Sequence, residues 1–384
     1  MQMTRRAAVA SVALAGFGPL GAAAQFDGNI ERGVKAAAEA FLAQTSTPGV
    51  SIGLLTRTGR YLFQFGHSHP AGNQPVDART LFELGSISKV ITVLLAELAV
   101  SEGAIRWDDA PGRHVPEVRG GGTDQITLLH LATHCIGGMP LQFPQQVRTW
   151  PDAAAWFRQW MPSARPGTLR TYANPSIALL AVVVARALGG EFSRLARQRV
   201  LDPLGLFDSF YEIPAADMVR YAQGHNRDGQ AVRLSRGVLA TETYGLRSTA
   251  ADVLRLLEAH MGRIETPEPL ARAVRAIQLG RYRSGPLIQA AVWEWFPAPA
   301  PREIVQAASS DAMVLRANPA TPLDVPTPPP PGALVNKTGG TGGFGAYAAF
   351  WPDRRQAMVI LANRNHPVSE RLALAARLRR LLEE

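Results

Sequence analysis

The chain has 384 residues, of which 46% are hydrophobic, so it is long enough for one large or two medium-sized globular domains. Its formal net charge is +9, but the basic residues are scattered, with no basic run and no interleaved aromatic residues. This pattern indicates a solvated basic surface and argues against a nucleic-acid-binding protein. Cys135 is the only cysteine, so no intramolecular disulfide is possible, and its apolar surroundings favour a small buried residue over a nucleophile.

The first 24 residues have the pattern of a secretory signal peptide. Arg5-Arg6 precedes an apolar stretch over residues 7–21, and small alanines follow, which predicts cleavage between Ala24 and Gln25. The apolar part is too short to span a bilayer. We therefore expect a periplasmic protein with no membrane attachment after cleavage. The arginine pair leaves the general and the twin-arginine export routes both open.

Regular elements are predicted first at the two ends of the chain. Apolar spacing indicates a helix over residues 28–44 near the start and another over residues 369–382 at the end. Two hairpins lie between these helices, each made of two apolar runs rich in strand formers. The hairpins are residues 50–55 with 61–65, and residues 344–351 with 357–362. Hairpins at both ends suggest one antiparallel sheet on which the terminal helices pack.

The middle of the chain is predicted to be mainly helical, and residues 326–332, with five prolines, form a stiff connector. The predicted helices cover residues 86–100, 126–133, 153–160, 175–188 and 250–261. The expected fold is therefore of the α/β class, in its α+β form: an antiparallel sheet flanked by the terminal helices, plus a mainly helical domain, with the active site at their interface. We assign residues 25–100 and 173–384 to the sheet-containing domain and residues 101–172 to the helical domain.

Lysine is rare in this chain and its positions are informative. Lysine and arginine total 40, yet only Lys35, Lys89 and Lys337 are lysines. An amine can lose its proton and arginine cannot, so a lysine kept in such a chain points to a chemical need for an amine.

The first candidate motif is Ser86-Ile87-Ser88-Lys89 at the start of an apolar helix. Unpaired backbone N–H groups at a helix start favour negative charge, and Lys89 falls one turn after Ser86 on the same face. A hydroxyl nucleophile needs a group that takes its proton and donors that hold an oxyanion, and this arrangement offers both. The alternative is a capping serine followed by a surface lysine.

Two further motifs are weaker when taken alone. In Tyr172-Ala173-Asn174 the phenol could transfer a proton and the amide could bind a polar group, although a buried tyrosine and a capping asparagine are the default. In Lys337-Thr338-Gly339-Gly340 and the glycines that follow, a substrate could approach a strand backbone closely, while Lys337 and Thr338 suit a carboxylate. The backbone N–H near Gly340 could serve as a second oxyanion donor.

Together these motifs resemble the serine β-lactamase and penicillin-binding superfamily, whose signature is S-x-x-K, a tyrosine- or serine-containing triplet and K-T-G. Within this superfamily, the sequence from about Phe26 onward is similar to class C β-lactamases. The segments that carry this narrower resemblance are residues 82–89, 126–133, 141–142, 237–239, 244–245, 248–249, 361–365 and Arg371.

The resemblance implies a serine hydrolase that opens the β-lactam amide through an acyl-enzyme on Ser86, with no metal or cofactor. Lys89 and Tyr172 would share the general-base work, and which of them is the base stays open. The remaining implied roles are an oxyanion site at the N–H groups of Ser86 and Gly340, side-chain binding by Gln142 and Asn174, carboxylate binding by Lys337, Thr338, Gly339, Asn365 and Arg371, and a pocket wall at Tyr244. The implied partner is a small β-lactam molecule, and we expect a monomer.

Several positions depart from the family pattern. His134-Cys135, Asn336, Gly340 and Val368 stand where other residues are common, which bears on substrate range and not on the reaction class. The ranking of penicillins, cephalosporins and carbapenems stays open.

Three other functions are possible. A metal hydrolase is suggested only by the His130/His134 and His67/His69 pairs, which lack the H-E-x-x-H glutamate and a third ligand. A related serine esterase or D-alanyl carboxypeptidase would use the same scaffold. A penicillin sensor would be acylated without turning over.

Overall fold

The computed structural model describes residues 11–12, 28–57, 59–235 and 237–383. Apart from Ser11–Val12, which forms strand β1 and pairs with β3, the predicted signal peptide and its cleavage site lie outside these residues.

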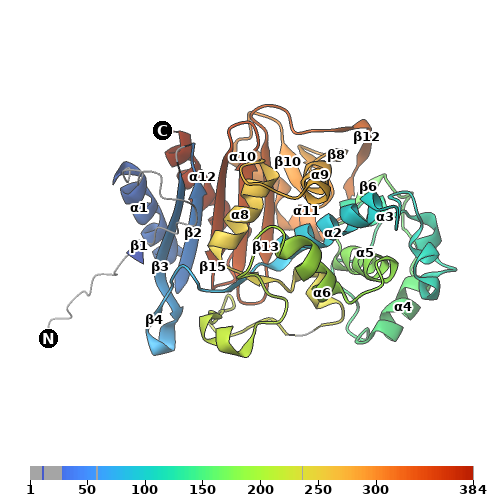
Figure 1. Ribbon diagram of the computed structural model, residues 1–384, viewed down its shortest axis with the longest axis horizontal. Helices are drawn as coiled ribbons and strands as arrows, with labels where there is room; N and C mark the ends of the chain where they lie inside the picture. Colours follow the sequence, from blue (N-terminus) through green and yellow to red (C-terminus); the bar gives the residue numbers. More distant parts are fainter. Residues whose placement is uncertain (1–10, 13–27, 58, 236, 384) are drawn as a thin grey trace.

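A large antiparallel sheet forms the centre of the molecule (Figure 1). Its order is β1-β3-β2-β15-β14-β13-β10-β9-β8-β12, and β4 pairs with β3 at one end. The strands after β1 are β2 (Gly49–Leu55), β3 (Arg60–His69), β4 (Gln74–Pro75), β8 (Gly280–Ser284), β9 (Leu287–Gln289), β10 (Glu294–Phe296), β12 (Thr321–Thr327), β13 (Leu334–Gly340), β14 (Gly345–Trp351) and β15 (Gln356–Ala362). Two small sheets pair β5 (Phe82–Glu83) with β7 (Arg247–Ser248) and β6 (Leu169–Arg170) with β11 (Asn318–Pro319).

The two ends of the chain meet inside this sheet. Strand β2 pairs with β15, with Ile52 opposite Ile360. Side chains on β15 alternate between two apolar cores, because successive residues of a strand point to opposite faces. Met358 and Ile360 belong to the core beneath the terminal helices, while Val359 and Leu361 belong to the core on the other face. Both faces of the sheet are therefore covered.

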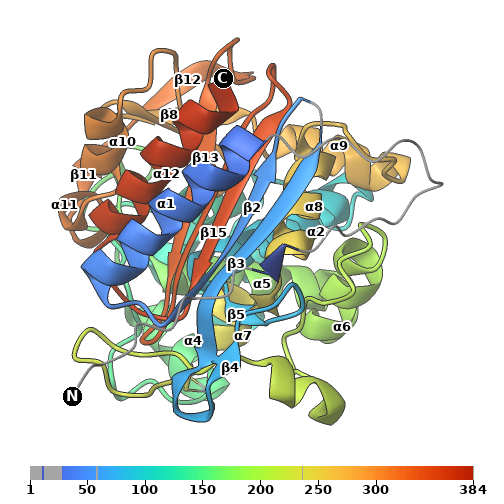
Figure 2. The same ribbon diagram turned by 90° about the vertical axis from the view of Figure 1, so that its left-hand side faces the viewer.

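Helices cover the two faces differently. On one face the terminal helices α1 (Gly28–Thr45) and α12 (Val368–Glu383) lie side by side (Figure 2). On the other face α8 (Ala250–His260) packs on β2 and β15. Helix α2 (Lys89–Ser101) is apolar on all sides because it packs between neighbours that include α5 (Asn174–Ala187) and α9 (Glu268–Ala276).

Of the remaining helices, α3 (Leu128–Thr133) and α4 (Trp150–Gln159) lie at the end of the molecule opposite α1 (Figure 1). Helix α10 (Arg302–Ala308) packs on α12. The others are α6 (Phe192–Ala196), α7 (Ala240–Tyr244) and α11 (Asp311–Leu315). Helices α3 and α4 each begin with a capping box, at Thr127 and Thr149, in which the threonine hydroxyl accepts the N–H of the residue three positions later. Helix α5 packs on both α2 and α3. The division of the chain after residues 100 and 172 stays a prediction.

The predicted fold class, both hairpins and both terminal helices are confirmed. Two predictions need correction. The helix expected from residue 86 begins at Lys89, because residues 85–88 form a 3-10 turn. The connector expected over residues 326–332 starts inside β12, an edge strand with an irregular register, where prolines are tolerated.

Among the described residues, no single helix is long and apolar enough to cross a membrane. Residues 174–187 and 192–201 meet the limits only when taken together, across a bend of 80°.

Candidate active site

A cleft of about 280 Å³ lies where β13, the turn before α2 and the loop before α5 meet. It brings together side chains from segments far apart in the chain. The residues that line it include Ser86, Gln142, Arg170, Tyr172, Asn174, Arg227, Glu294, Lys337, Thr338, Gly339, Gly340, Asn365 and Arg371. The three predicted motifs therefore share one cavity.

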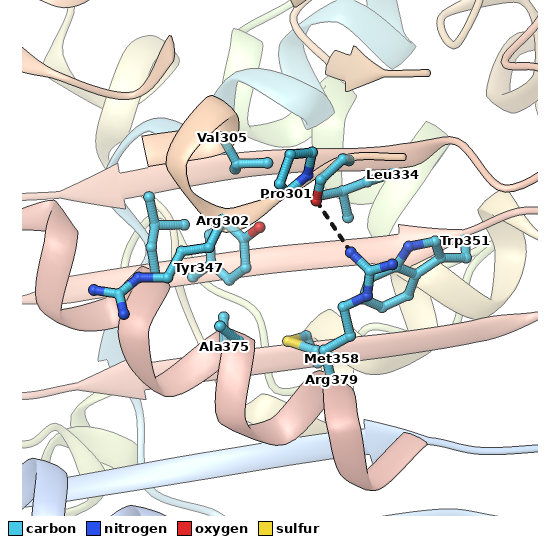
Figure 3. A pocket seen from close by; sticks show the side chains of 12 residues that line it. Pro301, Arg302, Val305, Leu334, Tyr347, Trp351, Met358, Ala375 and Arg379 are labelled. Carbon is cyan, nitrogen blue, oxygen red and sulfur yellow. Dashed lines mark hydrogen bonds between the residues drawn. The ribbon is translucent and has the colours of Figure 1, made fainter. Parts of the chain in front are cut away.

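A second hollow lies between α10, α12 and the sheet (Figure 3). It measures about 130 Å³, and most of its wall is apolar, including Val305, Leu334 and Trp351. Its one hydrogen bond in the figure joins Arg379 Nη1 to the carbonyl oxygen of Ala300, at 3.2 Å. Among the described residues that line it there is no serine, cysteine, histidine or acid. Side chains that could act as nucleophiles or bases line the cleft instead.

The position of Ser86 depends on close contact between two glycine backbones. Gly85 has φ +53°, and a Cβ added to it would lie 2.4 Å from the backbone nitrogen of Gly340. A Cβ on Gly339 would lie 2.0 Å from the carbonyl oxygen of Leu84. Glycine at these positions lets the turn that carries Ser86 lie directly against β13. The Gly340 amide is thereby brought beside the Ser86 turn.

Lys89 lies within hydrogen-bond distance of Ser86. Its side chain is fully buried, and its Nζ donates to Ser86 Oγ at 2.9 Å and to the carbonyl oxygen of Thr243 at 3.0 Å. The pKa of Lys89 is lowered to about 8: burial is the largest cause, Tyr172 opposes it, and Lys337 adds to it. A desolvated amine with a lowered pKa can give up its proton near neutral pH.

Tyr172 is buried between two ammonium groups. The Nζ atoms of Lys337 and Lys89 lie 4.9 and 5.3 Å from the centroid of its ring. Burial alone would raise the pKa of the phenol, but Lys337, Lys89 and the Ser86 hydroxyl together lower it to about 8. The phenol oxygen makes no hydrogen bond of good geometry. The Ser86 hydroxyl is nevertheless close enough to stabilise the phenolate form of Tyr172. The phenol can therefore exchange a proton near Ser86.

Two side-chain amides lie at the α5 end of the cleft. Asn174 is the first residue of α5, and its N–H donates to the Leu141 carbonyl oxygen at 2.9 Å. Its Oδ1 is buried and has no hydrogen-bond partner. The neighbouring Gln142 is exposed at the rim. A buried free amide oxygen beside an exposed amide suits a polar group that enters from solvent.

The other end of the cleft is strongly cationic. Arg371 is 5% exposed, its Nε has no hydrogen-bond partner, and burial followed by Arg227 lowers its pKa to about 10. Asn365 is held there by its N–H to the His225 carbonyl oxygen, at 2.8 Å, and by its Nδ2 to the Thr341 carbonyl oxygen, at 2.9 Å. Together with Lys337, these groups would attract an anion.

Tyr244 is not among the side chains that line the cleft. It ends α7, and its half-buried ring lies 6.0 Å from the Nζ of Lys89. Its ring therefore lies beside the Lys89 amine.

Sequence reasoning did not select Arg170, Arg227 or Glu294, all of which line the cleft. Arg170 and Glu294 form a buried ion pair at 2.6 Å. The one available signal was that Arg170 lies two residues before Tyr172; Glu294 stands in no recognisable motif.

The residues of the metal alternative have structural partners. The Nδ1 of His130 accepts the N–H of Thr127, and the Nδ1 of His134 lies 3.1 Å from the Ser176 hydroxyl. Within the described ranges, no group of three or more histidine, cysteine, aspartate or glutamate residues could hold a metal ion. Cys135 is fully buried, and burial raises the pKa of its thiol to about 12, which makes it a poor nucleophile.

Comparisons with known proteins agree on one family. Residues 34–383 match the family model described as Beta-lactamase. A beta-lactamase of Lysobacter lactamgenus is 40% identical over 349 residues, which cover 91% of this chain and 90% of that protein. The crystal structure of a beta-lactamase/D-alanine carboxypeptidase from Pseudomonas syringae has 36% identity and a TM-score of 0.89, covering 92% of this chain and 99% of that one. A class C beta-lactamase from Rhodobacter sphaeroides has 34% identity and a TM-score of 0.88, covering 92% and 100%.

Proposed function

This chain belongs to the beta-lactamase family, and from that premise we propose that Ser86 opens the β-lactam amide as the nucleophile of a class C enzyme. The observation that carries the proposal is the 2.9 Å hydrogen bond from Lys89 Nζ to Ser86 Oγ, with Tyr172 beside both. A serine hydroxyl is a weak nucleophile unless a neighbouring base takes its proton.

Acylation follows from this geometry. The Oγ of Ser86 attacks the lactam carbonyl carbon while its proton passes to the Lys89 and Tyr172 pair. The backbone N–H groups of Ser86 and Gly340 hold the developing oxyanion. The carbon–nitrogen bond of the ring then breaks, and the leaving nitrogen receives the proton from the same pair.

Deacylation uses the same groups in reverse. Water attacks the ester carbonyl from the side of Tyr172 and transfers a proton to that pair. The ester bond breaks, and Ser86 Oγ recovers its proton. Lys89 and Tyr172 have pKa values of about 8, so each can both accept and donate a proton near neutral pH.

The two ends of the cleft fix the orientation of the substrate. Asn174 and Gln142 bind the acylamino side chain at one end. Lys337, Thr338 and Gly339 of β13, with Asn365 and Arg371, bind the carboxylate at the other. The free Nε of buried Arg371 supports this assignment, because an unpaired buried guanidinium is stabilised by an anion. Tyr244 contributes to the site through its ring, which lies 6.0 Å from the Nζ of Lys89.

The protein's setting is also part of the proposal. We infer export to the periplasm after removal of residues 1–24, a monomeric state, and a division into a sheet-containing part and a helical part over residues 101–172. Mass determination of the exported protein tests the removal of residues 1–24. Size-exclusion chromatography with light scattering tests the monomeric state.

A D-alanyl carboxypeptidase activity is the second candidate, because the similar Pseudomonas syringae structure is described as both a β-lactamase and a D-alanine carboxypeptidase. Hydrolysis of a chromogenic cephalosporin by purified enzyme, compared with release of D-alanine from a D-alanyl-D-alanine peptide, separates the two activities. Continuing β-lactam turnover that survives a metal chelator supports the proposal. A single stoichiometric burst with no further turnover would contradict it and favour a sensor.

A further inference from the structure

One buried carboxylate balances the cations of the cleft. Glu294, on β10, is 5% exposed, and its Oε1 accepts a hydrogen bond from Arg170 Nη2 at 2.6 Å. The same oxygen lies 3.7 Å from Lys337 Nζ. Among the described residues that line the cleft, Glu294 is the single acid.

Glu294 is itself held in place. Asn336, which precedes Lys337 on β13, donates its Nδ2 to the backbone carbonyl oxygen of Glu294 at 3.1 Å. The Nε of Arg170 donates to Gln289 Oε1 at 2.6 Å, so the guanidinium is fixed from a second side. A carboxylate with this support has a defined orientation toward both cations.

Three cations surround the ring of Tyr172. The Nζ atoms of Lys337 and Lys89 lie 4.9 and 5.3 Å from its centroid, and the guanidinium carbon of Arg170 lies 5.8 Å away. In a desolvated site, three positive charges with no anion would hold the phenol in its ionised form. A phenol that cannot regain its proton cannot return it to a leaving group.

The other titratable group against this ring is uncharged. The ring centroid of His134 lies 4.3 Å from that of Tyr172, and its Nδ1 accepts the Ala173 N–H at 3.4 Å. Burial, followed by the charges of Arg170, Lys89 and Lys337, holds the pKa of His134 well below its usual range. The charge balance around the phenol therefore depends on the cations and on Glu294.

We propose that Glu294 is a positioning residue for the hydrolysis reaction: it anchors the Lys337 ammonium beside Tyr172 and limits the positive field on the phenol, so that the phenol can lose and regain a proton in each cycle. The inference rests on the proposed role of Tyr172. Its first consequence, the ionisation of that phenol, can be measured without turnover.

The test is Glu294→Gln, which keeps the shape and an oxygen that can accept from Arg170. The ionisation of Tyr172 is followed by tyrosinate absorbance as the difference between each protein and its Tyr172→Phe counterpart. Loss of the negative charge favours the phenolate, so the pKa of Tyr172 should fall by about one pH unit. The acid limb of kcat/KM should move to lower pH in parallel. A shift in the titration without one in the rate profile would support the charge effect of Glu294 but contradict the role of Tyr172.

Glu258→Gln is the matched control, because Glu258 is also a buried acid paired with an arginine, Arg60, but does not line the cleft. It should lose stability without moving either profile. An unchanged Tyr172 titration in folded Glu294→Gln, or an equal shift in the control, would overturn the proposal.

If the single variant does not fold, the double variant Arg170→Gln with Glu294→Gln removes both ions of the buried Arg170–Glu294 pair, so Arg170 is not left without its partner. Lys337, the nearer cation, then acts on the phenol without its counter-ion. The titration should again move to lower pH, and an unchanged value would contradict the inference.

Discussion

The amine of Lys89 donates a 2.9 Å hydrogen bond to the hydroxyl of Ser86. The hydroxyl needs this amine as a base, and the amine can act as that base only at this distance. Ser86 stands in the 3-10 turn over residues 85–88, and Lys89 is the first residue of α2. The turn places the half-buried Ser86 in the lining of the cleft, while the Lys89 side chain on the helix is fully buried. Because helix α2 begins at Lys89, the amine of this residue is buried, and this burial lowers its pKa.

Replacing Lys89 by arginine should nearly abolish hydrolysis. Arginine keeps the charge but cannot take the Ser86 proton, so kcat/KM should fall on the order of 100- to 10,000-fold. Lys35→Arg is the control, because Lys35 is exposed on α1 and does not line the cleft, and this variant should hydrolyse at the normal rate. Steady-state hydrolysis of a chromogenic cephalosporin measures both. A Lys89→Arg enzyme within a few-fold of wild type would remove Lys89 from the mechanism.

Adding a methyl group at Gly339 of β13 should move this strand away from the turn that carries Ser86. In Gly339→Ala the new Cβ would meet the Leu84 carbonyl oxygen at 2.0 Å, so β13 must move away from the Ser86 turn. We expect kcat to fall at least about 100-fold, since small displacements of reacting groups are costly. In Gly340→Ala the nearest atom would be 3.8 Å away, and activity should be kept. Equal activity in the two variants would contradict this account of the contact.

Arg371→Gln should weaken substrate binding more than catalysis. The buried guanidinium would lose its contact with the substrate carboxylate, which corresponds to a rise in KM of about 10- to 100-fold with a smaller change in kcat. Arg354→Gln, at a half-buried position in the β14–β15 turn outside the cleft, controls for the loss of one positive charge. Initial rates over a range of substrate concentrations distinguish the two constants. An unchanged KM would remove Arg371 from the carboxylate site.

Stability at acid pH should depend on His260. Its ring is buried against Trp293 and Phe350, and burial lowers its pKa from 6.5 to about 4. The folded state therefore favours the neutral ring, so its contribution is present above pH 6.5 and is lost as the pH falls toward 4. The loss is about 3 kcal/mol. Denaturant titrations should show a flatter decline over this range in His260→Phe. An unchanged slope would show that His260 does not control the decline.

The ends of the chain were predictable because their patterns are long. The runs that became β2, β14 and β15 are buried over every residue, and such apolar stretches between turn signals indicate strands. Strand β13 was suggested only through the glycines beside Lys337 and was given no bounds, since glycine weakens a strand when judged locally. It is a strand because β14 and β10 pair with it on both sides. Strands β8 to β10, of three to five residues, were missed because they are too short to show a pattern.

The site was predictable where residue scarcity carried information. Of the three lysines, Lys35 is exposed, whereas Lys89 and Lys337 are 0% and 2% exposed inside or beside the cleft. Arg170 and Glu294 carried no such signal. Arginine is common in this chain, and the two residues are 124 positions apart, so only the fold makes them a pair.

The central claim is that Ser86 carries the acyl group, and direct detection of the acyl-enzyme tests it most sharply. Enzyme quenched during β-lactam hydrolysis would be digested and its peptides mapped by mass spectrometry. We expect one substrate-mass adduct on the peptide that contains Ser86, and neither adduct nor hydrolysis in a folded Ser86→Ala enzyme. An adduct on another residue, or substantial turnover by Ser86→Ala, would contradict it.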